Sequence, residues 1–228
     1  MTITPTTLTR AAGVAAIAAG AVFIGVQVNH PQLDATSITT TEMAVRSSLK
    51  VLMAALALVG ISGMYLTQIE RMGKLGLLGF LLFGANYLVI LGTSFVAAYV
   101  LPSIATTNPT YVNDVLTAAE RRSTGDIGLL HAVIVGEGAL FLAGGLVFGI
   151  ALYRARLLLR WAAALLAVGG LVTAALTMMP DAFYRLLALP NSIALIGLGW
   201  SLWLSTRTDA AAQGTAVDPR LLTAAGAE

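Results

Sequence analysis

Long apolar stretches alternate with short polar segments from residue 11 to residue 205. A helix needs roughly 20 mostly apolar residues to cross the hydrocarbon core of a bilayer. Six stretches approach or exceed that length, at residues 11–28, 51–69, 75–101, 127–152, 157–179 and 186–205. Lipid offers no partner for unpaired backbone groups, so each stretch is predicted to be helical. We therefore expect an all-α fold, an integral membrane helical bundle with six transmembrane helices.

Composition supports this assignment. Hydrophobic residues make up 57% of the 228 positions and charged residues 11%, against roughly half and a quarter in soluble domains. Cysteine is absent, which excludes disulfides and thiolate metal sites. The net charge of +2 is too small to indicate a nucleic-acid partner. Membrane lipids are the expected partners instead.

The distribution of Lys and Arg predicts the orientation. With the N-terminus in the cytoplasm, the inner segments hold eight of these residues and the outer segments five, as the positive-inside rule requires. The bias is clearest in the tight turns at 70–74 and 153–156. We expect a multi-pass protein of a bacterial plasma membrane with both termini cytoplasmic. A cleaved signal peptide is the alternative for the first stretch, but its apolar run exceeds the usual ~7–15 residues.

We expect one transmembrane domain at residues 1–206, followed by a disordered cytoplasmic tail at 207–228, which is rich in Ala, Gly, Thr and Asp. Segment 37–50 has helix-compatible spacing and is interpreted as an outer extension of the second span. In the next outer loop, Asn108 can cap a helix and Pro109 suits its first position. Apolar residues of that helix share one face, namely Tyr111, Val112, Val115, Leu116 and Ala119. This pattern predicts an amphipathic helix in the outer loop, lying on the outer surface.

Glycines recur along the fourth predicted span, at positions 136, 138, 144, 145 and 149. Lipid provides no hydrophobic drive for helix association, so close backbone approach through small residues matters more. The fourth span is therefore expected to be the central helix of the bundle.

Glu137 lies about halfway along the fourth span. A charged acid at mid-membrane costs about 2.5–3.5 kcal/mol or more, so such residues usually face the bundle interior and mark a site. Glu137 is a candidate proton carrier, general acid or base, or anchor for a polar ligand. The structural alternative is a neutral carboxylic acid bonded to Asn86 or to a backbone carbonyl, which would hold two helices together.

Two histidines are expected on the outer side. His131 precedes Glu137 by six residues on one helix, so the two side chains point about 120° apart and cannot pair directly. Both can still border one cavity. His30 is followed by Asp34, and the candidates for ligand binding or proton transfer are thus Glu137, His131, Asn86, His30 and Asp34. A haem or metal held by His30 and His131 is an alternative interpretation; otherwise no metal ligand set is predicted. Lys50 is placed at the end of a span.

Several short segments resemble a bacterial multi-pass membrane family catalogued as domain of unknown function 4386. They are Thr-Arg-Ala-Ala-Gly at 9–13, the outer segment 42–46, Leu-His-Ala at 130–132, Ala-Leu-Tyr-Arg at 151–154 and the stretch from Arg-Trp-Ala at 160–162 to the glycines at 169–170. The resemblance covers residues 9–205. It implies a six-helix fold and draws attention to His131. It implies no activity, because none is established for that family.

Three functions fit these features. The first is binding or transport of a small or lipid-like ligand in an outward-facing polar pocket lined by His131, Glu137 and Asn86, with His30 as a further candidate, motivated by the buried acid. The second is a structural or accessory subunit of a membrane complex, or a homo-oligomer, whose polar residues only lock helices together. The third is an intramembrane enzyme in which Glu137 and His131 transfer protons on a lipid or isoprenoid substrate.

Overall fold

The computed structural model describes residues 4–120, 125–176 and 188–215, with side chains described up to residue 172 in the second range and residue 206 in the third. This part of the chain is helical and contains no strand, which confirms the all-α prediction. The elements are α1 (Pro5–Gln27), η1 (Ser37–Thr39), α2 (Thr41–Leu66), α3 (Ile69–Tyr99), α4 (Leu101–Ala105), α5 (Pro109–Ala119), α6 (Leu129–Ala155), α7 (Arg160–Leu176) and α8 (Leu189–Thr215).

Four helices in the described ranges are long and apolar enough to cross a membrane: α1, α2, α3 and α6. They correspond to the first four predicted spans. The fifth prediction corresponds to α7, which has 17 residues and is apolar but shorter. Length and composition therefore support four of the six predicted spans.

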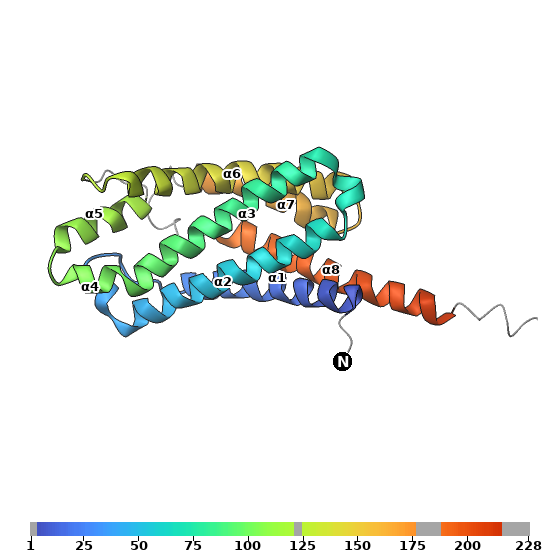
Figure 1. Cartoon of the computed structure of the whole chain (residues 1–228), viewed down its shortest axis with the longest axis horizontal. Helices are drawn as coiled ribbons and strands as arrows, with labels where there is room; N and C mark the ends of the chain where they lie inside the picture. The colour runs from blue at the N-terminus through green and yellow to red at the C-terminus, as the bar shows by residue number, and fades with distance from the viewer. Residues whose placement is uncertain (1–3, 121–124, 177–187, 216–228) are drawn as a thin grey trace, which may run out of the picture.

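The long helices pack in a ring that follows their order in the chain. The order is α1, α2, α3, α6, α7 and α8, and α8 packs back against α1 (Figure 1). Helix α6 contacts chiefly α3 and α7, so the expectation that it would be the central helix is wrong. Gly144 lies against α3 and Gly149 against α7, whereas a Cβ on Gly136 would have nothing within 4 Å.

Glycines set the close approaches around this ring. A Cβ atom built on Gly144 of α6 would lie 2.7 Å from the Phe83 backbone of α3, and one on Gly149 would lie 2.4 Å from the Ala167 backbone of α7. Across the α1–α8 contact, a Cβ on Gly13 would lie 2.8 Å from the Gly199 carbonyl oxygen. The absence of a side chain at these positions is what lets the backbones meet.

One end of the bundle is covered by η1, α4 and α5 (Figure 1). Helix α2 begins at Thr41, with the Thr40 side chain as its N-cap. Residues 41–50 of the predicted extension are therefore continuous with the second span, whereas residues 37–39 form the separate helix η1. Helix α5 begins at Pro109 with Asn108 as its N-cap, also as predicted. Its apolar face is buried against η1, α2 and α4 in a second apolar cluster. The apolar face of α5 was expected to lie on the outer surface. It is covered instead by other parts of the protein, including Ile38 and Leu101.

The start of α1 and the end of α8 lie at the opposite end, together with the α2–α3 and α6–α7 turns (Figure 1). Gly73 kinks α3 near its start with φ of 54°, a conformation that glycine adopts without steric cost. Helix α8 continues to Thr215, so the segment predicted as a disordered tail, 207–228, begins inside a helix. Its run of alanines favours helix; residues 216–228 lie outside the described residues.

Candidate functional site

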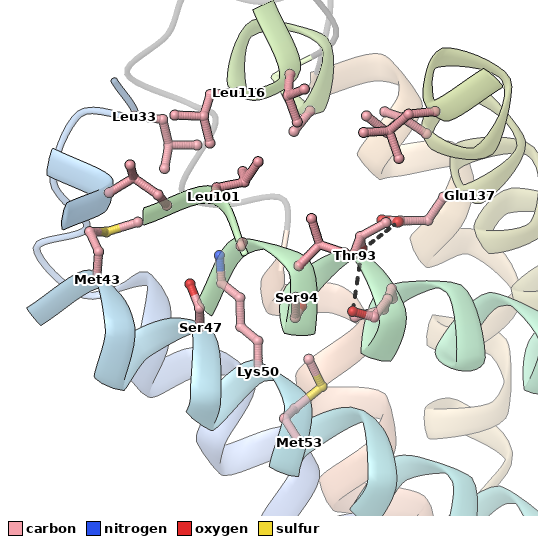
Figure 2. Close-up of a pocket in the computed structure, with 18 of the residues that line it drawn as sticks. Leu33, Met43, Ser47, Lys50, Met53, Thr93, Ser94, Leu101, Leu116 and Glu137 are labelled. Atoms are coloured by element: carbon pink, nitrogen blue, oxygen red, sulfur yellow. Dashed lines mark hydrogen bonds between the residues drawn. The ribbon is translucent and has the colours of Figure 1, made fainter. Parts of the chain in front are cut away.

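A cavity of about 290 Å³ lies at the covered end of the bundle. Its walls come from α1, α2, α3 and α6, and residues of η1, α4 and α5 also line it (Figure 2). Most lining side chains are apolar, including Met43, Met53, Leu101 and Leu116. The polar ones are Gln27, Ser47, Lys50, Thr93, Ser94 and Glu137. Apolar walls with a few converging polar groups are typical of small-molecule sites.

Lys50 enters this cavity from α2 (Figure 2). Its Nζ lies 3.3 Å from His30 Nε2. The other ring nitrogen, His30 Nδ1, lies 2.9 Å from the Pro31 carbonyl oxygen. A carbonyl only accepts, so Nδ1 carries the proton in the neutral ring and Nε2 accepts a hydrogen bond from the Lys50 ammonium. The histidine thus positions the lysine.

Glu137 reaches the cavity from α6, on another wall (Figure 2). The Thr93 hydroxyl of α3 donates to Glu137 Oε2 at 3.1 Å and also lies 3.2 Å from the Ile90 carbonyl oxygen. Lys50 and Glu137 interact electrostatically. The acid is therefore joined to α3 through Thr93, and Asn86, the partner considered from the sequence, does not supply the bond.

The structure separates the other sequence candidates. His131 is exposed on the first turn of α6 and does not line the cavity, so it is not brought together with Glu137. Asp34 shapes the turn before η1: its Oδ1 accepts from the backbone N–H groups of Thr36 and Ser37 at 2.9 and 2.7 Å. Asn86 is fully buried away from the cavity, and its amide has no hydrogen-bond partner among the described residues.

The structure also bears on the metal and haem alternative. The described residues contain no group of three or more His, Cys, Asp or Glu side chains that could hold a metal ion. Both ring nitrogens of His30 contact protein atoms, at Pro31 and Lys50. A metal would have to displace one of these contacts, so the residues at His30 do not fit a ready ligand site.

Sequence reasoning missed Lys50, because the apolar run of the second span begins only at Val51. The spacing of residues just before and within the apolar run could have identified it. Met43, Ser47, Lys50, Ala54 and Ala57 recur at alternating intervals of four and three residues. This is the period of one inward face of a helix, and most of these positions are indeed buried. Extending that face outward from the apolar run would have placed Lys50 inside the bundle.

Comparisons of the chain with protein-family models, with curated proteins and with solved structures found no match.

Proposed function

We propose that this chain is a multi-pass membrane protein that binds a small or lipid-like ligand in the cavity between α1, α2, α3 and α6. The observation that carries the proposal is the placement of Lys50 and Glu137 on different walls of one largely apolar cavity. Charged groups are costly inside a membrane bundle. When two charged side chains line one cavity, they are typical of a site that binds the polar part of a ligand.

Six membrane spans form part of the same proposal. Helices α7 and α8 complete the ring with the four candidate spans, packing between α6 and α1. With 17 residues, α7 is about 25 Å long, close to the hydrocarbon thickness of about 30 Å. Large apolar side chains are exposed on the outside of the bundle, among them Leu81 and Leu88 of α3 and Val59 of α2, as lipid contact requires.

The proposed orientation places both termini in the cytoplasm of a bacterium and the cavity toward the outer face. Exposed basic residues, including Arg71, Lys74 and Arg154, gather at the end opposite the cavity. Trp161 at the start of α7 is exposed, and aromatic rings of this kind anchor helices at the membrane interface. Membership of the family catalogued as domain of unknown function 4386 is part of the proposal. The six proposed spans match the six-helix fold that this resemblance implies.

Filling the cavity tests the binding proposal. Ala97 lines the cavity from α3, and Gly92, on the same helix, is exposed with open space beside it. The protein is purified from membranes in mild detergent, and small amphiphiles that copurify are quantified by mass spectrometry. We expect them in the native chain and in Gly92→Phe, and their loss in Ala97→Phe. Equal recovery from all three proteins would overturn the proposal.

The absence of cysteine from the chain makes the topology directly testable. Thr107→Cys places a thiol between α4 and α5, and Arg71→Cys places one in the α2–α3 turn; both positions are exposed. A membrane-impermeant maleimide added to intact cells should label the first variant and not the second. Labelling of the second variant in intact cells would reverse the orientation.

A further inference from the structure

The lysine wall of the cavity offers hydrogen-bond donors that the protein leaves unused. An ammonium carries three N–H donors, and His30 Nε2 accepts one of them. In the described ranges no other hydrogen bond involves Lys50, and Figure 2 shows its nitrogen directed into the cavity. The remaining donors are therefore available to a ligand acceptor.

Ser47 adds a neutral polar group to the same wall. It precedes Lys50 by three residues on α2, so the two side chains share a face, and its hydroxyl oxygen lies on the cavity side in Figure 2. Ser47 is only 3% exposed and makes no side-chain hydrogen bond to the residues that the structure describes. Its hydroxyl can therefore donate to a ligand in the cavity. Its position beside a cation favours an anionic oxygen as the acceptor.

The opposite wall has the reverse character. The carboxylate of Glu137 accepts from Thr93 on this wall. Ser94, 7% exposed, lines the cavity close to Thr93 in sequence and makes no side-chain hydrogen bond to the described residues. A carboxylate on this wall disfavours the anionic end of a ligand.

Size and the remaining lining restrict the ligand further. The volume of about 290 Å³ equals that of about ten water molecules in the liquid and lies at the small end of ligand pockets. A lipid with two long acyl chains is therefore too large to be enclosed. Flexible, polarisable Met43 and Met53 line the space, and methionine adapts to apolar groups of varied shape.

We propose that the cavity takes a short amphipathic carboxylic acid, whose carboxylate binds Lys50 and Ser47 while its apolar chain lies among the methionine and leucine side chains toward Glu137. This inference rests on the proposed binding function and specifies its ligand. The two-charge arrangement orients the acid, because the carboxylate is attracted by the lysine and repelled by the glutamate.

Three probes of equal chain length test the ligand class: octanoate, octanol and octylamine. Binding to the full chain in lipid nanodiscs is measured by equilibrium dialysis, with empty nanodiscs correcting for partition into lipid. We expect octanoate to bind at least tenfold more tightly than octanol, and octylamine not to exceed octanol. Lys50→Met should lower octanoate affinity at least tenfold and leave octanol affinity unchanged, which shows that the variant is folded. Lys74→Met, at an exposed position, is the matched control and should change neither.

The outcomes separate the two proposals. Octanoate and octanol binding equally, both lost in Ala97→Phe, would overturn the carboxylic-acid inference and leave the binding function standing. Tighter binding of octylamine, lost in Glu137→Gln, would instead assign a cationic ligand and also overturn the inference. No binding of any probe above empty nanodiscs, together with equal amphiphile recovery from native protein and Ala97→Phe, would overturn both.

Discussion

Thr93 of α3 donates a hydrogen bond of 3.1 Å to Glu137 of α6, joining two neighbouring helices beside the cavity. Interhelical side-chain hydrogen bonds in membranes contribute about 0.6 kcal/mol on average and up to about 1.7. Thr93→Val should therefore lower the free energy of unfolding by about 0.6–1.7 kcal/mol, measured by detergent-induced unfolding in mixed micelles. Thr93→Ser keeps the hydroxyl and should retain most of the stability; an equal loss in both variants would contradict the assignment.

Asn86 and Asn191 form a matched pair of buried amides with opposite expectations. Asn191 Nδ2 donates to the Tyr87 hydroxyl at 2.8 Å, whereas both amide atoms of Asn86 have no hydrogen-bond partner among the described residues. An unsatisfied buried polar group costs about 1–3 kcal/mol. Asn86→Leu should thus leave the free energy of unfolding unchanged or raise it by about 1–2 kcal/mol. Asn191→Leu should lower it by about 1–3 kcal/mol, because the Tyr87 hydroxyl loses its partner.

The same unfolding measurement compares these two variants directly. A large loss of stability in Asn86→Leu would mean that the amide has a partner in the folded protein. The comparison is matched in residue type, substitution and burial, since both asparagines are almost fully buried.

Gly79 lies at a close approach of α3 and α6. A Cβ on Gly79 would lie 2.6 Å from the Phe148 backbone, which has no flexible end that could move away. Gly79→Ala should lower the free energy of unfolding by about 1–3 kcal/mol through overpacking. Gly84, on the same helix, has nothing within 4 Å of the added atom. Gly84→Ala should be neutral or stabilising by up to about 1 kcal/mol, because alanine favours helix over glycine.

The prediction depends on the two variants changing the free energy of unfolding differently, with a loss only in Gly79→Ala. If Gly84→Ala destabilised the protein as much as Gly79→Ala, another surface would have to lie against Gly84, and the packing at Gly79 would not be the reason for either loss.

Arg46 of α2 holds the end of α1. Its guanidinium donates to the carbonyl oxygens of Val26, Val28 and Asn29 at 3.0, 2.9 and 3.3 Å. Helix ends leave such carbonyls without partners inside the helix. Arg46→Met should lower the free energy of unfolding by about 1.5–3 kcal/mol, the usual contribution of hydrogen bonds to charged groups. The exposed Arg71 is the control, and Arg71→Met should stay within about 0.5 kcal/mol of the native chain.

Calorimetric or detergent-induced unfolding of both variants checks this prediction. A loss in Arg46→Met no larger than that in Arg71→Met would show that water or lipid headgroups satisfy the α1 carbonyls equally well.

The helices were predictable because their causes are local in sequence, although α1 and α3 begin at Pro5 and Ile69, ahead of the apolar stretches that start at residues 11 and 75. Each apolar stretch corresponds to a helix in the structure, since a helix satisfies its own backbone within the segment. Thr40 and Asn108 cap α2 and α5 through bonds to residues three positions later, and such contacts depend on the neighbouring sequence alone. The apolar pattern fixed these elements, although it placed the end of α8 too early.

The site was predictable only in part. Glu137 was found from the sequence because an acid within an apolar run is costly wherever the helix packs. Lys50 was missed because it lies outside the apolar run, and His131 was retained as a candidate although it faces away from the cavity. Which direction a side chain faces relative to the bundle depends on the neighbours of its helix.

The amino-acid sequence by itself determined that this protein is built of apolar helices and that a mid-helix acid needs an explanation. Only the tertiary structure decided that α6 lies in a ring beside α3 and α7, that Thr93 is the partner of Glu137, and that Lys50 shares their cavity. The reason is physical, because these relationships join residues far apart in the chain. They depend on which helix surfaces can approach each other closely. Glycines such as Gly79 and Gly144 allow that approach where they contact another helix.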